Sequence, residues 1–199
     1  MKKNLQYLNN LCYNLIINRL DRRETNTMKK EEKGIFDART LACYIGDKYK
    51  GFSHGKEISN IKLQKSLYFL LAFWGGFIRK GTLKDTETDV STISDILFSN
   101  EIQAWVYGPV VVDVYHARKN NCLNEYREDL GATFEIIPML KDTIDSLLED
   151  IFAVADFKLV STSHEDMSWQ NHFDITAERH NEKIPQEEII QEYTLRDAI

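Results

Sequence analysis

The segment from residue 59 to residue 78 is the most apolar part of the chain. The remaining segments therefore have to fold around it and bury it. Its apolar side chains recur at helical spacing, at Ile61, Leu63, Leu67, Leu70, Leu71 and Trp74. After Lys65 the segment is apolar on nearly every side, which is typical of a helix buried at the centre of a domain. We expect Ser59 or Asn60 to cap this helix, and Gly75 and Gly76 to weaken its end. The apolar run is too short to span a membrane, which requires about 20 residues.

Five further segments show helical spacing, and a chain of 199 residues is long enough for one domain that buries them. They cover residues 38–49, 110–119, 141–156, 157–163 and 185–193. Asp37 is a suitable N-cap for the first of these helices. Pro109 fits the first turn of the second, where its missing N–H has no helical partner to lose.

Alternating side chains predict a short strand or hairpin at 102–107, which Gly108 ends, and a second short strand at 133–137. Polar loops are expected at 80–96 and 163–169. The sequence therefore predicts a mainly α fold (α+β). We expect a compact helical domain with a small β-hairpin or short sheet.

Residues 1–27 stand apart from this pattern. Apolar residues at helical spacing predict an N-terminal amphipathic helix, at Leu5, Leu8, Leu11, Cys12, Leu15, Ile16 and Leu20. A polar linker follows over 21–27, and then Met28 begins a repeat of the Met-Lys-Lys opening of the chain. Two interpretations stay open. Either Met28 is the true start, or 1–27 is an accessory helix ahead of the domain at 28–199.

The net charge of −6 conceals an uneven distribution along the chain. Residues 1–80 carry 16 Lys and Arg against 7 Asp and Glu, whereas residues 81–199 carry 9 against 24. The two halves either complement each other as solvated faces of one fold, or orient the protein on a charged partner. In the second case a cationic partner is expected on the acidic side.

The cysteines indicate a reducing compartment. Cys12, Cys43 and Cys122 are odd in number and widely spaced, and no Cys-x-x-Cys pair is present. The opening residues are also interrupted by Asn and Gln, unlike the apolar core of a signal peptide. We therefore expect a cytoplasmic protein that does not enter the membrane.

The search for catalytic motifs yields weak candidates. The chain has no phosphate-binding loop and no nucleophile elbow. His164, His172 and His180 lie eight residues apart, with Glu165 and Asp166 beside the first, which leaves a metal-dependent enzyme around His164 and His172 as one alternative. The two acidic residues are also weighed as an acid–base pair. A structural hydrogen-bonding role for His164 is favoured over both.

A nucleic-acid-binding regulator is the other alternative. Phosphate contacts require a basic patch, and the basic first half of the chain would supply it. The basic residues available to it are Lys29, Lys30, Lys33, Arg39, Lys48, Lys50, Lys56, Lys62 and Lys65. Direct binding is disfavoured because the whole chain is acidic, and because aromatic and basic residues do not interleave as in a single-strand platform.

Three segments together resemble a known family. They read NIKLQKSLYF at 60–69, IQAWVYGPV at 102–110 followed by Val114 and Tyr115, and SHEDMSW at 163–169. In this order and spacing they resemble the Panacea domain, the SocA-like antitoxin family that includes the phage-associated GepA proteins. The Ala-Trp-x-Tyr-Gly-Pro-Val part is the most specific, and the resemblance holds from about Phe36 to Tyr193. The chain departs from the family with Ser168 in place of Pro and Ser66 in place of Leu.

The resemblance implies a non-enzymatic antitoxin without cofactor or metal. Its partner would be a cognate protein toxin from a neighbouring gene, in a toxin–antitoxin system that also occurs in phages and prophages. Neutralisation would proceed either by direct binding or through a cellular protease to which the toxin is delivered. The choice between these modes, the toxin and the interface are not given by the sequence.

The family-motif residues have two readings, as structural core or as partner contacts. They are Lys62, Leu63, Gln64, Lys65, Tyr68, Ala104, Trp105, Tyr107, Gly108, Pro109, Val110, Tyr115, His164, Glu165 and Trp169. We favour the core reading, because the chain's three Trp lie in or beside these segments and large aromatics bury much area. Gly108 would then permit the turn between strand and helix, and His164 would hold the loop before Trp169. Partner contacts are expected mainly on variable surfaces, including 1–27.

Overall fold

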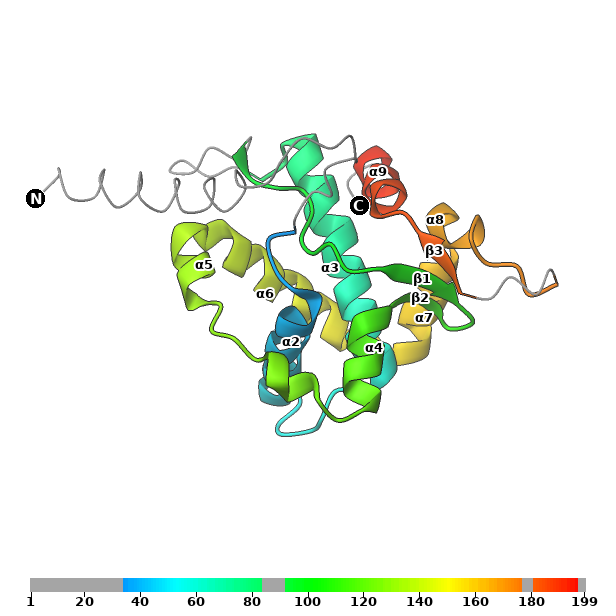
Figure 1. Ribbon diagram of the computed structural model, residues 1–199. Coiled ribbons are helices and arrows are strands. Elements are labelled where there is room, and N and C mark those ends of the chain that lie inside the picture. Colours follow the sequence, from blue (N-terminus) through cyan, green and yellow to red (C-terminus); the bar gives the residue numbers. More distant parts are fainter. Residues whose placement is uncertain (1–33, 84–91, 177–180, 197–199) are drawn as a thin grey trace, which may run out of the picture. The chain divides into compact units, whose positions relative to one another are not determined.

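The computed structural model describes residues 34–83, 92–176 and 181–196 (Figure 1). The predicted N-terminal helix and linker at 1–27, and Met28, lie outside the described residues. Helix α3, Asn60–Lys80, runs through the middle of the described domain. Ser59 caps its start by accepting a hydrogen bond from the backbone N–H of Lys62, and Gly81 ends it in the left-handed conformation. The prediction of a buried central helix is confirmed.

The prediction that Gly75 and Gly76 weaken the end of this helix is wrong, because α3 continues to Lys80. Both glycines lie where helix α9, Gln186–Leu195, packs on α3. A Cβ on Gly75 would lie 2.6 Å from Cγ1 of Ile190, and one on Gly76 would lie 3.1 Å from the backbone of Tyr193. The glycines therefore permit close approach of two helices instead of breaking one.

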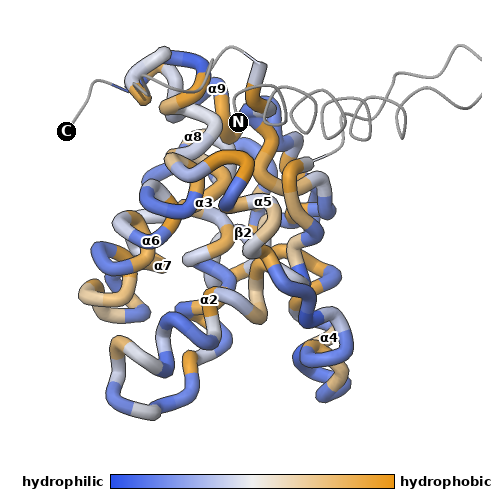
Figure 2. Tube along the Cα trace, turned by 90° about the vertical axis from the view of Figure 1, so that its left-hand side faces the viewer, coloured by the Kyte–Doolittle hydropathy of each residue, from blue (hydrophilic) through white to orange (hydrophobic). Residues whose placement is uncertain are grey.

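Helix α2, Ala38–Phe52, and helix α6, Pro138–Ala153, also pack on α3. Asp37 caps α2 as predicted, and accepts from the backbone N–H groups of Arg39 and Thr40. Helix α6 begins three residues before the predicted range, with Pro138 in its first turn. Figure 2 shows apolar residues gathered around α3 and its neighbours, while hydrophilic residues prevail on α4.

The predicted hairpin is confirmed, but its second strand takes residues that were assigned to a helix. Strands β1, Ile102–Trp105, and β2, Gly108–Val111, pair antiparallel, with Ala104 opposite Pro109. Helix α4, Val112–Lys119, begins only after β2. Pro109 is tolerated because β2 is an edge strand of a sheet with the order β2-β1-β3. Strand β3, Glu182–Ile184, was not predicted.

The predicted strand at 133–137 is wrong. Residues Gly131–Ile136 form helix α5, preceded by the 3-10 helix η2 at Leu123–Tyr126. The Phe134 ring lies 5.8 Å from Phe36 and 5.3 Å from Tyr44, centre to centre, so a helical turn buries it. A five-residue alternation was too short to distinguish strand from helix.

The predicted helix at 157–163 is confirmed as α7, Asp156–His164. The predicted loop at 163–169 is mostly helical, because α7 extends through His164 and the short helix α8 covers Met167–Gln170. The predicted mainly α fold with a small sheet is confirmed. Within the described ranges no helix is long and apolar enough to cross a membrane.

Candidate functional site

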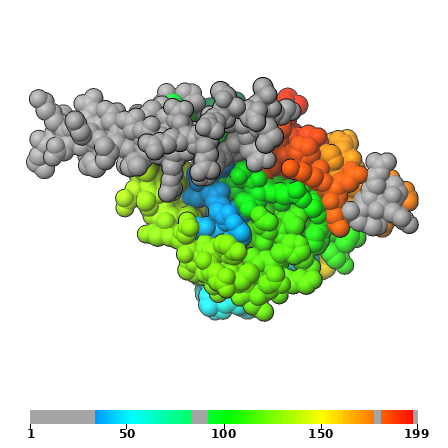
Figure 3. Space-filling view, viewed as in Figure 1, coloured from blue at the N-terminus to red at the C-terminus, as the bar shows by residue number. Residues whose placement is uncertain are grey.

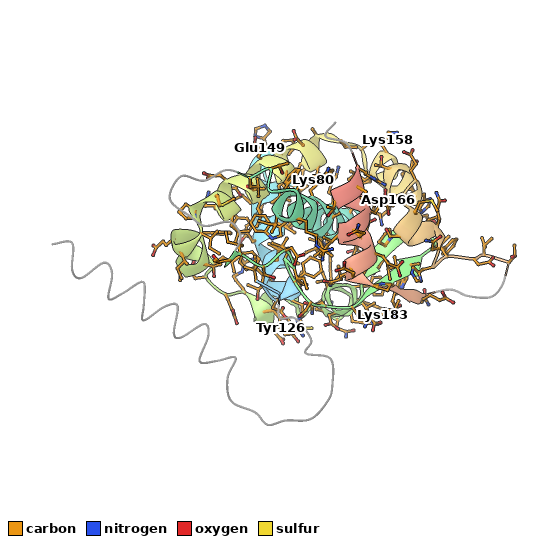
Figure 4. All side chains as sticks on the ribbon, turned by 90° about the horizontal axis from the view of Figure 1, so that it is seen from above. Lys80, Tyr126, Glu149, Lys158, Asp166 and Lys183 are labelled. Atoms are coloured by element: carbon orange, nitrogen blue, oxygen red, sulfur yellow. The ribbon has the colours of Figure 1, made fainter. Side chains whose placement is uncertain are left out.

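A buried carboxylate lies where the second half of the chain folds back on α3. Asp166, in the link between α7 and α8, is 0% exposed. Its oxygens accept hydrogen bonds from the Tyr68 hydroxyl at 2.5 Å, the Tyr193 hydroxyl at 3.0 Å and Nη2 of Arg196 at 2.6 Å. In Figure 4 Asp166 lies beside α9. The carboxylate thus joins α3, the α7–α8 link and the end of α9.

Burial dominates the acid–base properties of this cluster. Desolvation raises the pKa of Asp166, although the bonds from Tyr68 and Arg196 act in the opposite direction. Desolvation and the nearby carboxylate also raise the pKa of Tyr68 and Tyr193, so both phenols remain hydrogen-bond donors. The polar atoms of the cluster bond to one another, so the cluster serves to stabilise the fold.

A second carboxylate positions helix α8. The side chain of Glu192 accepts from the backbone N–H groups of Met167 and Ser168, both at 2.9 Å. It also accepts from Arg196, the residue directly after α9, at 2.6 Å. These bonds satisfy N–H groups at the start of α8 that have no intrahelical partner.

Lys65 is buried beneath the hairpin. It is 1% exposed, and its Nζ donates to the carbonyl oxygen of Pro109 at 2.9 Å. Burial lowers the pKa of Lys65 to about 7, against the opposing attraction of Asp166. Gly108 has φ of +90°, and a Cβ there would lie 2.6 Å from Lys65 Nζ and 2.5 Å from Ser163 Oγ. Gly108 is therefore required by its backbone conformation and by its contact with Lys65.

Two further polar residues of α3 bind backbone groups. Gln64 accepts from the N–H of Val111 at 2.7 Å and donates to its carbonyl at 3.4 Å. Lys62 donates to the carbonyls of Phe152 and Val154 and pairs with Asp156 at 3.2 Å. The polar residues of the first motif segment thus fasten the hairpin and the α6–α7 link to α3.

His164 and Trp169 form a stacked pair under the hairpin. Their rings are parallel within 13°, with centres 4.0 Å apart. Trp169 Nε1 donates to the carbonyl of Trp105 at 3.1 Å, and His164 bonds the backbone of Val106. Burial lowers the pKa of His164, with a smaller effect from Lys65. Nε2 of His164 is buried and has no hydrogen-bond partner among the described residues.

The tip of the hairpin, in contrast, is exposed and apolar. Val106 is 55% exposed and Tyr107 is 57% exposed, between the two paired strands. The Tyr107 ring lies 6.4 Å, centre to centre, from that of Phe157 on α7, which is 66% exposed. We call Val106, Tyr107 and Phe157 the hairpin-tip surface.

The motif residues separate into three groups by exposure. The buried group comprises Lys62, Leu63, Gln64, Lys65, Tyr68, Ala104, Gly108, Pro109, Val110 and Trp169. The half-buried group comprises Trp105, Tyr115 and His164, and the exposed group comprises Tyr107 and Glu165. The structure adds Tyr193, Glu192 and Arg196, which the sequence analysis did not single out as site residues.

Among the residues that the structure describes, those proposed for a metal or an acid–base pair do not assemble. Glu165 is exposed, whereas Asp166 is buried and bonded internally, so the two carboxylates diverge. His172 bonds Glu188 at 2.9 Å, on α9. In the part of the chain that the structure describes, no group of three His, Cys, Asp or Glu is suited to a metal ion. His180 lies outside that part.

The basic residues proposed for a nucleic-acid surface are largely engaged. Lys62 and Lys65 are buried and directed inward. Arg39 pairs with Asp37, Lys48 with Asp145, and Lys50 with Glu57. Of the others, Lys56 is exposed, and Lys29, Lys30 and Lys33 lie outside the described residues.

No protein-family model, curated protein or solved structure matches the chain. The resemblance to the Panacea domain therefore stays a prediction that rests on the three motif segments.

Proposed function

We propose that this protein is a non-enzymatic interaction module of the antitoxin type, which binds a protein toxin encoded by a neighbouring gene and neutralises it. The proposal takes its class of partner from the resemblance to the Panacea domain. The observation that supports it most is the hairpin-tip surface. It places Val106 and Tyr107, from the most specific motif segment, in solvent beside Phe157.

Rigidity beneath this surface favours binding. The hairpin is held from below by Gln64, Lys65 and Trp169, each of which bonds its backbone. A surface that is already ordered loses little conformational entropy when a partner docks. Tyrosine, the residue type at position 107, is also enriched among residues that dominate binding energy. The motif residues would therefore serve recognition indirectly, as a support for the hairpin-tip surface.

The buried polar groups argue for this role over catalysis. Lys65 and Asp166 have shifted pKa values, as many catalytic groups do. Their polar atoms, however, are bonded to the protein's own groups and shielded from any substrate. In this proposal they stabilise the fold, and the protein acts in the cytoplasm with Cys43 and Cys122 as free thiols.

Co-expression with the neighbouring gene tests the proposal. The neighbouring product alone should stop growth, and the wild-type protein should restore growth and co-purify with the toxin. A Tyr107→Ser/Phe157→Ser variant should fail in both. Leu195→Ser is the matched control, because Leu195 is 73% exposed on α9 and lies outside the hairpin-tip surface. A harmless neighbour, or a toxin that never co-purifies, contradicts the proposal.

The same experiment separates the two modes of neutralisation. Direct blocking predicts that toxin levels stay constant and that the complex is stable. Delivery to a protease predicts that toxin levels fall when the wild-type protein is present, and recover in strains that lack the protease.

A further inference from the structure

A cleft of about 460 Å³ lies between α2 and α5, away from the hairpin. Its apolar lining is formed by Tyr44, Leu130 and Phe134, and its acidic rim by Asp47, Glu128 and Asp129. We call these six residues the α2–α5 cleft. Segments distant in the sequence adjoin one another here. On the face seen in Figure 3, the start of α2 in blue lies against segments in yellow-green.

The apolar lining is fixed in place. The Phe134 ring packs against the rings of Phe36 and Tyr44. The Tyr44 hydroxyl donates to Asp145 at 2.5 Å, which holds the ring from the α6 side. Since the lining does not have to reorganise, an incoming apolar group would meet a preformed surface.

The rim carries unneutralised negative charge. Asp47 is paired with Arg127, but Glu128 and Asp129 make no ion pair with any described residue. Asp129 accepts only the backbone N–H of Gly131, at 2.8 Å, which leaves its charge in place. Arg127 also lines the cleft, so its three carboxylates and one guanidinium sum to two negative charges.

The chemistry of this cleft matches a side chain that is apolar along its length and positive at its tip. Arginine and lysine both bury their methylene stems and keep the charged end in water. Arginine fits better, because its planar guanidinium stacks on aromatic rings and binds carboxylates in pairs. Both contacts already occur beside the cleft. Arg39 lies 4.1 Å over the Tyr126 ring, and Arg127 binds both oxygens of Asp47.

We infer that the α2–α5 cleft is a docking site for an arginine side chain of a partner protein, with the stem on Tyr44 and Phe134 and the guanidinium at Glu128 and Asp129. This inference rests on the proposed function only in naming a protein toxin as the source of the arginine. It adds a second contact surface, distinct from the hairpin-tip surface, and requires a basic segment in the partner.

The test uses the ¹⁵N-labelled full chain and the peptide acetyl-Gly-Arg-Gly-amide, followed by NMR chemical shifts. The peptide should shift amide signals around Tyr44 and Leu130–Phe134. The citrulline counterpart, which has the same shape without the charge, should bind at least about five-fold more weakly. Glu128→Gln/Asp129→Asn should weaken arginine binding by a similar factor, as expected for two exposed ion pairs.

The matched control is Glu149→Gln/Asp150→Asn, which removes the same charge from exposed positions on α6. Glu149 lies at the opposite edge of Figure 4 from Tyr126, the residue before Arg127. This variant should bind the peptide as the wild type does. Absence of shifts at the cleft, equal binding of citrulline, or unchanged binding by Glu128→Gln/Asp129→Asn overturns the inference. So do cleft shifts that depend on protein concentration without peptide, since a second copy would then fill the site.

Failure of this inference is distinguishable from failure of the proposed function. Peptide binding is measured without the toxin. If the chain binds the peptide but neutralises no toxin, the inference about the cleft holds and the proposed antitoxin function fails. If the chain neutralises the toxin but does not bind the peptide, the proposed function holds and the inference about the cleft fails.

Discussion

Replacement of Gly108 by alanine tests the support beneath the hairpin most sharply. Gly108 begins β2 with φ of +90°, where a side chain is strained whatever space surrounds it. In addition, the new Cβ would meet Lys65 Nζ at 2.6 Å and Ser163 Oγ at 2.5 Å. Both neighbours are buried, so neither has room to move aside into solvent.

The two effects have separate magnitudes. A non-glycine residue in the left-handed region costs roughly 1–2 kcal/mol. Forcing extra atoms into a packed interior costs typically about 1–3 kcal/mol more. Gly108→Ala should therefore lower the free energy of unfolding by about 2–5 kcal/mol. Gly55→Ala isolates the first effect, because Gly55 has φ of +97° and no atom within 4 Å of its added Cβ.

Urea denaturation followed by far-ultraviolet circular dichroism measures both variants. Gly108→Ala should lose at least about 1 kcal/mol more than Gly55→Ala, with an unchanged dependence on urea. Equal losses in the two variants would refute the reasoning, because the contact with Lys65 and Ser163 would then carry no cost.

Three further predictions concern stability. Asp166→Ala should lower the free energy of unfolding by about 3–5 kcal/mol, because it leaves buried donors unpaired. The neighbouring variant Glu165→Ala should change the free energy of unfolding by less than about 0.5 kcal/mol. Similar losses for the two variants in thermal or urea unfolding would contradict this prediction. Between pH 7 and 10.5, the wild type should gain stability relative to Lys65→Met by at most about 1.4 kcal/mol per pH unit, because the unfolded lysine keeps its proton there while the folded one has released it. A pH-independent difference in urea unfolding between these two proteins would show that Lys65 has an ordinary pKa. Gly46→Ala, in α2 with nothing within 4 Å, should raise the free energy of unfolding by roughly 0.5–1 kcal/mol, and a lower melting temperature would count against it.

The long helices were predictable because their sequence pattern and their packing agree. Asp37 caps α2, and the apolar residues after Lys65 form the buried part of α3. The hairpin was predictable because alternation ends abruptly at Gly108. The misplaced start of α4 has a simple cause. Pro109 suits both a helix start and an edge strand, and only pairing with Ala104 decides between them.

Other features depend on contacts between distant segments. In the sequence alone, Gly75 and Gly76 resemble a helix end. Their contact with α9, which explains them, is formed by a segment more than 100 residues away. Strand β3 has three residues, too few for alternation to be recognised, and exists because it pairs with β1.

In the candidate site too, some residues were predictable from local sequence, while others depend on contacts between distant segments. Lys65, Tyr68 and His164 were singled out from their motif segments, but Tyr193 and Arg196, the other two partners of Asp166, were not. Tyr193 and Arg196 reach Asp166 from the last helix, 27 and 30 residues away, and no local pattern connects them. A buried carboxylate is also indistinguishable in sequence from the exposed one beside it, Glu165.

The central claim is that the hairpin-tip surface binds a protein toxin. It is tested most directly by the affinity of the purified neighbouring-gene product for the wild type, Tyr107→Ser/Phe157→Ser and Leu195→Ser, by isothermal titration calorimetry. Truncation of a hot-spot residue, a class in which Tyr is enriched, costs about 2 kcal/mol or more of binding energy. We predict at least about a tenfold loss of affinity in the double variant, with folding and the affinity of Leu195→Ser unchanged. Equal affinity of the three proteins, or no binding by the wild type, would contradict the claim.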